Sequence, residues 1–245
     1  MKLLLVDNSN TRTKFALSDP DGSITATFWT PTSSIEPDVL AQKLSHLDFD
    51  AAVICSVVPD KRGMIEAYLS VRGPLHRITH ESPLNLAIDY PKPPSIGADR
   101  LANAVGVVAR HGAPAIVIDF GTAVTFDIVS KKPAYVGGVI APGLGAMSDY
   151  LGRKTALLPQ IELAEPESAI GKSTAGAMQA GAVIGYRGLV REIIAAIRSE
   201  LGGQVKTIAT GGDAGLIASG VAEIDTVDRD LTLAGIDRIG RRAFG

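Results

Sequence analysis

Short apolar runs that end on an acidic residue occur twice along the chain. The run Leu3 to Val6 ends at Asp7, and the run Ala115 to Ile118 ends at Asp119. Small polar residues follow each acid, and a second apolar-rich segment follows these. Short apolar runs bounded by turn-forming residues are typical of buried strands. Both regions are therefore predicted to form a strand, a tight polar turn and a second strand.

The two regions are related by a constant offset, which indicates a duplicated unit. An offset of 112 positions relates three pairs of residues: Asp7 and Asp119, Ser9 and Gly121, and Thr13 and Thr125. Internal repetition of this kind indicates one structural unit used twice. We expect two similar α/β domains, residues 1–113 and 114–245, that face each other across a cleft with both turns pointing into it.

The remaining periodicity predicts the other elements. In the first half we expect strands near 3–7, 11–18, 23–29, 51–57 and 75–79, and helices near 37–47 and 60–71. Prolines make 90–100 a loop, because proline is excluded from helix interiors and central strands, and an alanine-rich helix then ends near residue 111. In the second half we expect strands within 115–129, near 134–141 and at 206–210, a long helix near 174–201, and a last helix whose polar face carries Arg238, Arg241 and Arg242.

Composition places the chain among ordinary globular proteins. Of its 245 residues, 46% are hydrophobic and 20% are charged, and the net charge is -2. This charge gives no electrostatic reason to expect nucleic acid or an anionic membrane as a partner. The single cysteine, Cys55, excludes an internal disulfide and suits a reducing compartment. The apolar runs are too short for a membrane span or a signal peptide, so we expect a cytoplasmic location.

The two acid-bearing turns carry the strongest chemical signal. Turns of small and hydroxyl residues expose backbone N–H groups, which bind anionic oxygens. A carboxylate at the end of the strand can hold a cation that bridges to a phosphate. One such turn alone is equally well explained as a local turn with a solvated acid. Two turns at matching places in a duplicated fold favour a nucleotide site.

A second candidate lies at the expected start of the alanine-rich helix. Asp99 and Arg100 are adjacent there, and the helix dipole favours a carboxylate at this end. A carboxylate can accept a proton from a substrate hydroxyl during phosphoryl transfer, and an arginine can bind an organic anion through two hydrogen bonds. On these two residues alone, a helix cap with a surface ion pair is the stronger explanation.

Glycine-rich segments give weaker signals. The segment 137–143 (GGVIAPG) lies between an expected strand and a helix, and 210–212 (TGG) follows a strand. Glycine permits close approach of a ligand to the backbone, as an adenine ring would require, but tight packing explains both segments equally well. The segment 170–174 (IGKST) imitates a P-loop, yet Pro166 stands where that pattern requires glycine. Ser173 or Thr174 is instead expected to cap the long helix.

The chain closely resembles the type III pantothenate kinases, members of the superfamily that includes acetate kinase, sugar kinases and actin. The resemblance covers nearly the whole chain and rests on short motifs whose order and spacing are together specific. These motifs are the turn at 7–11, SVVP at 56–59, Tyr90, GADR at 97–100, DFGTA at 119–123, GGVIAPG at 137–143, TALLP at 155–159 and TGG at 210–212.

The resemblance implies both a fold and a reaction. The fold would consist of duplicated ribonuclease H-like (actin-like ATPase) domains, with mixed β-sheets flanked by helices and a cleft between them. The reaction would be ATP-dependent phosphorylation of pantothenate to 4′-phosphopantothenate, the first step of coenzyme A biosynthesis. The implied partners are ATP, pantothenate and a second copy of the chain, with the active site near the homodimer interface.

The resemblance also implies roles for individual residues. Asp99 would be the catalytic base that accepts the proton of the pantothenate hydroxyl. Pantothenate would be bound by Tyr90, Gly97, Ala98, Asp99, Arg100 and Thr174, with Arg100 binding its carboxylate. ATP would be held by Thr122 and by the turn residues Asp7, Asn8, Ser9, Asn10, Thr11, Arg12, Thr13 and Lys14. The implied cations are Mg2+, oriented by Asp7 through water, and a monovalent cation, K+ or NH4+, at Asp119.

The first turn departs from the family's pattern at two positions. The family usually has glycine where this chain has Ser9, and an aliphatic residue where it has Asn8. A serine is strained if its position requires a positive φ, and its side chain narrows the approach of phosphate oxygens. We therefore expect a cost to ATP binding at Ser9.

Two other functions stay open on the same scaffold. The first is a non-catalytic transcriptional accessory factor, against which the retained Asp7, Asp99 and Asp119 argue. The second is a kinase of the same superfamily that acts on a sugar or a short acid. Tyr90 followed by the GADR segment favours pantothenate over these acceptors.

Overall fold

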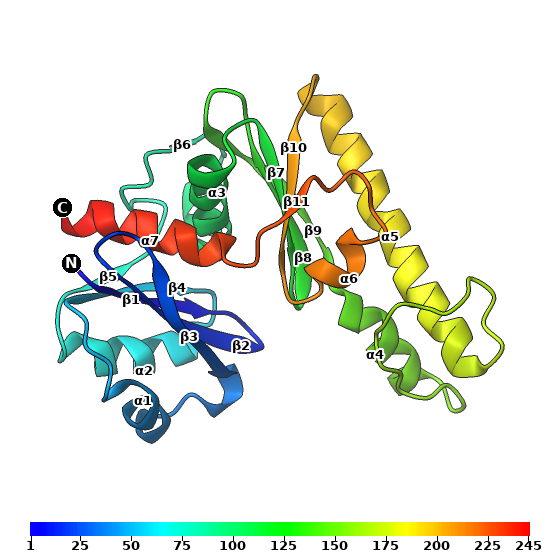
Figure 1. The fold of residues 1–245 in the computed structure, drawn as a ribbon, viewed down its shortest axis with the longest axis horizontal. Helices are drawn as coiled ribbons and strands as arrows, with labels where there is room; N and C mark the ends of the chain where they lie inside the picture. Colours follow the sequence, from blue (N-terminus) through cyan, green and yellow to red (C-terminus); the bar gives the residue numbers. More distant parts are fainter. The chain divides into compact units, whose positions relative to one another are not determined.

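The computed structural model describes residues 1 to 245, which form two compact units (Figure 1). Unit 1 comprises Met1–Gly112, Pro133–Val136 and Asp230–Gly245, and unit 2 comprises Ala113–Lys132 and Gly137–Arg229. The first boundary between the units lies between Gly112 and Ala113, one residue before the expected boundary. The expected division into 1–113 and 114–245 needs two corrections, because Pro133–Val136 and the residues after Arg229 belong to unit 1.

A five-stranded mixed sheet forms the centre of unit 1. Its order is β3-β2-β1-β4-β5, with β1 antiparallel to β2 and parallel to β4. The strands are β1 (Leu3–Asn8), β2 (Arg12–Ser18), β3 (Ile24–Pro31), β4 (Ala51–Ser56) and β5 (Leu75–Arg77). Successive side chains of β1 enter two different buried clusters, Leu3 and Leu5 one of them and Leu4 and Val6 the other. Burial on both faces explains why this strand is continuously apolar.

Helices cover both faces of this sheet. The cluster with Leu4 and Val6 also contains residues of α1 (Pro37–Leu44) and α2 (Pro59–Ser70). The cluster with Leu3 and Leu5 contains residues of α3 (Ala98–Arg110) and α7 (Leu231–Phe244). Two 3-10 turns, η1 (Thr32–Ser34) and η2 (Pro93–Ser95), complete the helical elements of the unit.

Close packing of α3 against α7 explains why the last helix belongs to unit 1. A Cβ atom on Gly235 of α7 would lie 1.8 Å from the carbonyl oxygen of Ala102, and one on Gly106 of α3 would lie 2.4 Å from the carbonyl oxygen of Leu231. The two glycines therefore allow the helix backbones to touch. Nothing in the hydrophobic pattern predicts this contact, since it depends on the absence of side chains.

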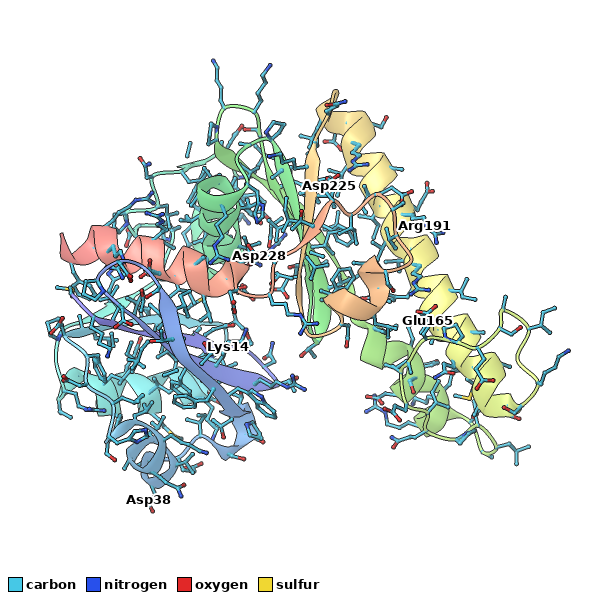
Figure 2. The ribbon with its side chains drawn as sticks, in the orientation of Figure 1. Lys14, Asp38, Glu165, Arg191, Asp225 and Asp228 are labelled. Carbon is cyan, nitrogen blue, oxygen red and sulfur yellow. The ribbon has the colours of Figure 1, made fainter.

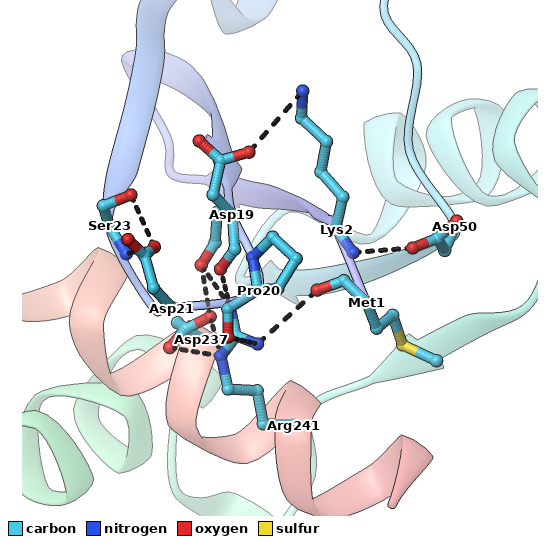
Figure 3. A network of polar contacts seen from close by, with 10 residues as sticks. Met1, Lys2, Asp19, Pro20, Asp21, Ser23, Asp50, Asp237 and Arg241 are labelled. Atoms are coloured by element: carbon cyan, nitrogen blue, oxygen red, sulfur yellow. Dashed lines mark hydrogen bonds and ion pairs between the residues drawn. The ribbon is translucent and has the colours of Figure 1, made fainter.

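Arg241 of α7 has a structural role beyond the solvent-exposed helix face expected from the sequence. Its Nε lies 2.9 Å from Asp237 Oδ1, and its Nη2 donates to Ser18 Oγ at 2.7 Å and to the carbonyl oxygen of Asp19 (Figure 3). Asp237 is buried and also accepts from Ser18 Oγ at 2.6 Å. These contacts join α7 to the β2–β3 hairpin, which corrects the expectation for this arginine.

The second sheet has the strand order β11-β10-β7-β8-β9-β6. Its strands are β7 (Ala115–Phe120), β8 (Ala123–Val129), β9 (Ala134–Pro142), β10 (Lys206–Gly211), β11 (Thr226–Val227) and the two-residue β6 (Ala87–Ile88). Most of this sheet belongs to unit 2, whereas β6 and the start of β9 belong to unit 1. The helices of unit 2 are α4 (Leu144–Lys154), α5 (Thr174–Leu201) and α6 (Ala214–Ala218). The expected elements are present with shifted ends, whereas β6 and β11 were not expected.

The segment between α4 and α5 has no regular secondary structure, but hydrogen bonds to Glu165 hold it in place. Both carboxylate oxygens of Glu165 accept from Arg187 of α5, at 2.8 and 2.6 Å (Figure 2 labels Glu165). Arg187 also donates to the carbonyl oxygen of Leu216 and to Ser219 Oγ, at 2.7 and 3.0 Å. One arginine thus ties the segment to α5 and to the α6 region.

The duplication is visible in the two strand–turn–strand segments, with one correction to the sequence alignment. β1 and β7 have the same succession of buried and half-buried positions. In the sheet register, Lys14 of β2 (Figure 2) lies opposite Asp7, and Thr125 of β8 lies opposite Asp119. Thr125 therefore corresponds to Lys14, and the expected match of Thr125 with Thr13 is wrong by one residue. The second hairpin is one residue shorter, which a constant offset cannot detect.

Candidate functional site

Asp99 lies in the first turn of α3, and the residues around it are shaped by its carboxylate. Its Oδ1 accepts a hydrogen bond from the backbone N–H of Arg100 at 2.8 Å. A Cβ atom on Gly97, the residue before the helix, would lie 2.4 Å from the same oxygen. Glycine at this position therefore leaves room for the carboxylate to fold back over the helix start.

Burial raises the pKa of the Asp99 carboxyl group above its ordinary value. The N–H of Arg100 and the positive charge of the same residue act in the opposite direction and offset part of the effect. A carboxylate whose pKa is raised accepts a proton from a hydroxyl more readily than a fully solvated one. Asp99 thus has the properties that a general base needs.

Arg100, which follows Asp99 in the chain, lies beside Tyr135, and Tyr135 lies beside Tyr90. The Arg100 guanidinium carbon is 5.7 Å from the ring centroid of Tyr135, and the Tyr90 and Tyr135 rings meet edge to face at 6.1 Å. The pairing of β6 with β9 brings these segments together, and the N–H of Asp89 donates to the Tyr135 carbonyl oxygen at 2.9 Å. Sequence reasoning found Tyr90 and Arg100 but missed Tyr135, because a two-residue strand has no detectable periodicity.

Ala98 is placed differently from the expectation. Its side chain belongs to the buried cluster of unit 1 that contains Leu3 and Leu5. Any contact of Ala98 with a ligand therefore falls to its backbone, and its place in the pantothenate site stays a prediction. Ala98 anchors the start of α3 in the core, which fixes the position of Asp99 in the next residue.

The first acid-bearing turn is closed by hydrogen bonds at its base. Ser9 N–H donates to the Arg12 carbonyl oxygen at 3.2 Å, and Ser9 Oγ donates to Asp7 Oδ1 at 3.0 Å. Asn10 and Thr11 are exposed at the tip. The Arg12 guanidinium carbon lies 4.6 Å from the centroid of the Trp29 ring, a cation–π contact on the adjacent strand.

Two of the turn residues expected to bind ATP have buried side chains. Asn8 is 1% exposed and Thr13 is 0% exposed, and Asn8 Nδ2 donates to Thr13 Oγ1 at 2.8 Å. Their side chains cannot contact a ligand in this structure, because they bond to each other beneath the turn. The expectation is corrected for these two side chains, and the other turn residues stay at or near the surface.

The strain expected at Ser9 is absent. The non-glycine residues with positive φ are Ala26 and Asn85, so Ser9 adopts an ordinary backbone conformation. Gly121, at the matching place of the second turn, also lacks a positive φ, and a Cβ atom there would lie 3.4 Å from the nearest atom, the Ala123 carbonyl oxygen. Neither turn therefore requires glycine at this position for conformational reasons.

The second acid-bearing turn is enclosed by two glycines of unit 2. A Cβ atom on Gly143 would lie 2.3 Å from the Gly121 carbonyl oxygen, and the Gly143 N–H donates to the Thr122 carbonyl oxygen at 3.1 Å. Gly211 has a φ of +93°, and a Cβ atom there would lie 2.6 Å from Asp119 Oδ1. The glycine-rich segments at 137–143 and 210–212 thus meet the turn, and packing alone explains both glycines.

Tyr186 of α5 supports this turn from the buried side and was missed by sequence reasoning. It is 1% exposed, its hydroxyl donates to the Pro142 carbonyl oxygen at 3.1 Å, and its ring centroid is 6.4 Å from that of Phe120. Burial and the negative charge of Asp213 raise the pKa of the Tyr186 hydroxyl. The hydroxyl therefore stays protonated and acts as a donor throughout the physiological range.

Thr174 is the first residue of α5 in unit 2 and lies in an apolar environment. Ser173 caps the helix by accepting from the Gly176 N–H at 3.1 Å, which decides between the two expected caps. Thr174 lines a pocket of about 490 Å³ together with Met147, Leu151, Leu158, Ala177, Met178, Gly181 and Ala182. Several apolar side chains of this region are exposed: Met147, Tyr150, Leu157, Ile170 and Ile184.

The predicted residues are thus distributed over both units. Unit 1 contains the Asp7 turn and the group formed by Asp99, Arg100 and Tyr90, and unit 2 contains Asp119, Thr122 and Thr174. No group of three or more His, Cys, Asp or Glu side chains is placed to hold a metal ion. None of the helices combines the length and the hydrophobicity that a membrane span requires.

The class of protein is defined first by the fold. A Campylobacter jejuni protein described as a Baf family transcriptional activator matches with a TM-score of 0.64 at 19% identity, covering 98% of each chain. A Sinorhizobium meliloti protein described as a 2-dehydro-3-deoxygalactonokinase matches with a TM-score of 0.63 at 15% identity, also covering 98% of each chain. At these identities the likeness shows the fold alone, which is that of the actin-like ATPases and sugar kinases.

The family follows from sequence relatives. Residues 3–196 match the family model described as type III pantothenate kinase. A type III pantothenate kinase from Akkermansia muciniphila is 52% identical over 236 residues, which cover 96% of this chain and 97% of the relative. The chain belongs to the type III pantothenate kinase family.

Proposed function

We propose that the chain transfers the γ-phosphoryl group of ATP to the terminal hydroxyl of pantothenate, giving 4′-phosphopantothenate, with Asp99 as the general base. The observation that carries this proposal is the half-buried carboxylate of Asp99 at the start of α3, with its raised pKa and with Arg100 as its neighbour. Family membership supports the same reaction. Phosphoryl transfer depends mostly on positioning and charge stabilisation, so one base and well-placed donors suffice.

Pantothenate is proposed to bind along the start of α3. Arg100 offers its N–H donors to the pantothenate carboxylate, and its contact with the Tyr135 ring at 5.7 Å limits its freedom. Tyr90 and the backbone of Gly97 line the same region of unit 1. The Thr174 hydroxyl is a further proposed contact of pantothenate. Asp99 then takes the proton of the substrate hydroxyl as that oxygen attacks the phosphorus atom.

Each acid-bearing turn is proposed to take part in binding ATP, with Thr122 of the second turn in contact with ATP. Carboxylate and carbonyl oxygens are the ligands that hard cations prefer. Asp7 fits Mg2+ held through water, and Asp119 fits K+ or NH4+, since each carboxylate lies near the end of a strand and offers oxygen ligands at a turn. When bound, these cations neutralise the charge of the phosphates.

A homodimer and a cytoplasmic location complete the proposal. The exposed apolar side chains near Thr174, among them Tyr150 at 62% and Leu157 at 90% exposure, favour a partner copy on this face of unit 2. A charged replacement, Tyr150→Glu, should shift the mass measured by light scattering from dimer to monomer. An unchanged mass would remove this face from the interface.

The reaction is tested by measuring ADP release that depends on pantothenate, with Mg2+ and K+ present. Asp99→Asn should lower kcat by about 100-fold or more, as loss of a general base does. A panel of sugars and short hydroxy acids serves as the control for acceptor choice. Turnover with one of these and none with pantothenate would replace the proposal, and near-normal activity of Asp99→Asn would remove Asp99 from its role.

Asp99→Asn should also change how the stability of the protein depends on pH, and this change shows that the variant is folded. Because the pKa of Asp99 is raised in the folded protein, its contribution to stability is fully present only below the unfolded pKa, near 3.9, and is lost as the pH rises through the folded value. Asp99→Asn should therefore be more stable than the wild type at pH 7 and lose this advantage below about pH 4. Thermal unfolding between these pH values measures the difference.

A further inference from the structure

A continuous series of polar side chains, three of them buried and one half-buried, lies beneath the first acid-bearing turn. Ser56 Oγ lies 2.6 Å from Asn8 Oδ1, Asn8 Nδ2 lies 2.8 Å from Thr13 Oγ1, and Thr13 Oγ1 lies 2.9 Å from Thr32 Oγ1. Thr32 Oγ1 lies 2.6 Å from the carbonyl oxygen of Ser9 in the turn itself. We call Ser56, Asn8, Thr13 and Thr32 the polar relay. It joins β4, β1, β2 and η1 to the turn.

The chemistry of the last acceptor fixes the direction of every hydrogen bond in the polar relay. A carbonyl oxygen can only accept, so the Thr32 hydroxyl must donate to Ser9. Thr32 therefore accepts from the Thr13 hydroxyl, and Thr13 accepts from the amide N–H of Asn8. The Asn8 carbonyl oxygen is left to accept from Ser56, whose oxygen in turn accepts from the Val58 N–H at 3.2 Å.

This single direction makes the polar relay cooperative. Asn8, Thr13 and Thr32 are 1%, 0% and 3% exposed, so water cannot replace a missing partner. Hydrogen bonds in series polarise one another in a low-dielectric interior, and a buried group left without its partner is costly. Loss of the Thr32 hydroxyl therefore removes the hydrogen bond to Ser9 and weakens the other hydrogen bonds of the series.

Thr32 holds the turn at two points. Besides the hydroxyl bond to Ser9, its backbone N–H donates to the carbonyl oxygen of Thr11 at 3.0 Å. A trans peptide is planar, so its N–H points opposite to its carbonyl oxygen, and the cis bond of the chain lies elsewhere, at Ala113-Pro114. With the Ser9 carbonyl oxygen fixed on Thr32, the N–H of Asn10 must point away from Thr32 at the exposed tip of the turn.

We propose that Thr32 is a positioning residue for ATP, because the polar relay fixes the direction in which the tip of the turn presents its N–H donor to the phosphates. This inference rests on the proposed role of the turn in ATP binding. It assigns a function to a residue outside the turn, and it explains why polar side chains occupy fully buried positions under it.

Thr32→Val tests the inference, since valine keeps the shape and removes the hydroxyl. We expect an about tenfold rise in the KM for ATP and in the Kd of a non-hydrolysable ATP analogue, the effect of one lost hydrogen bond in a buried series. The KM for pantothenate should not change. Thr32→Ser restores the hydroxyl and should restore the wild-type affinity for the analogue.

Thr232→Val is the matched control. Thr232 is 7% exposed and its hydroxyl donates to Asn103 Oδ1 at 2.8 Å, between α7 and α3. This variant loses one buried hydroxyl bond as Thr32→Val does, so both should unfold at a lower urea concentration, but only Thr32→Val should lose ATP affinity. Should Thr32→Val not fold, Ser56→Ala, at the other end of the polar relay, should raise the Kd of the analogue about threefold.

The outcomes separate the inference from the proposed function. Equal affinity of folded Thr32→Val and wild type for the analogue overturns the role of Thr32 and leaves the kinase intact. An equal loss in Thr32→Val and Thr232→Val also overturns it, because a general loss of stability would then be the cause. A wild-type protein that binds no analogue and turns over no pantothenate overturns both.

Discussion

The two acid-bearing turns share a backbone plan but are held by different chemistry. The first, after β1, rests on the polar relay, in which hydroxyl and amide groups bond in one direction. The second, after β7, rests on Gly143 and Gly211, which leave no room for a side chain, and on the buried ring of Tyr186. The same strand–turn–strand plan can therefore be stabilised by directed hydrogen bonds or by close apolar and backbone packing.

The difference also predicts which kind of substitution destabilises each turn. Loss of a relay member leaves neighbouring polar groups without partners, but the space around them stays filled. An atom added at Gly143 or Gly211 forces backbone segments apart, because the nearest atom in each case is a backbone carbonyl oxygen. The second turn should thus be the more sensitive of the two to enlargement, and the first to loss of polarity.

The largest effect is expected for Gly211→Ala. Gly211 has a φ of +93°, and the added Cβ would lie 2.5 Å from the Phe120 carbonyl oxygen. Backbone strain and overpacking together should lower the free energy of unfolding by roughly 3 kcal/mol. Urea unfolding measures the loss. Gly212→Ala is the control, because no atom would lie within 4 Å of the added Cβ, and its free energy of unfolding should change little. Equal midpoints for the two variants would contradict the packing account of the second turn.

A smaller effect is expected for Tyr186→Phe. The variant keeps the ring contact with Phe120 but leaves the Pro142 carbonyl oxygen without its donor at 3.1 Å. The free energy of unfolding should fall by about 1–2 kcal/mol, and the KM for ATP should rise while that for pantothenate stays constant. Tyr68→Phe, which removes the hydroxyl of a half-buried tyrosine of α2 outside the site, serves as the control. A wild-type KM for ATP in Tyr186→Phe would show that the second turn does not depend on this hydroxyl.

The smallest effect is expected for Ser9→Gly, which restores the residue usual in the family. Because Ser9 has no positive φ, glycine relieves no strain, and only the Ser9 Oγ bond to Asp7 at 3.0 Å is lost. The KM for ATP should change by less than about threefold, and stability should fall by about 0.5–1 kcal/mol through added chain entropy. A tenfold gain in ATP affinity would mean instead that the Ser9 side chain obstructs the phosphates.

The sequence predicts much of the fold because a buried strand has a recognisable local run of apolar residues. The apolar run at 3–6 and its partner at 115–118 identify the two central strands, and the repeated acid identifies the duplication. The match of Thr125 with Thr13 failed because register depends on hairpin length, which a shared offset cannot reveal. The place of α7 in unit 1 was missed because Gly106 and Gly235 act through the absence of atoms.

The sequence predicts residues of the candidate site only where residues that act together are also neighbours in the sequence. Asp99 and Arg100 stand next to each other in sequence, so the motif reveals both. Tyr135, Tyr186 and Thr32 contact the site through residues 45, 44 and 23 positions away, namely Tyr90, Pro142 and Ser9. Such partners are set by the sheet and helix arrangement, and nothing in their local sequence marks them.

The contact of α7 with α3 has a consequence for synthesis of the chain on the ribosome. Leu233, Ile236 and Ile239 of α7 belong to the same buried cluster as Leu101 and Val105 of α3, the helix that carries Asp99. Domains generally fold as units during synthesis, but the part of α3 that packs against α7 stays uncovered until residues 231–244 have emerged. More than 100 residues separate the two helices in the chain, so we expect unit 1 to be completed only when its final helix docks.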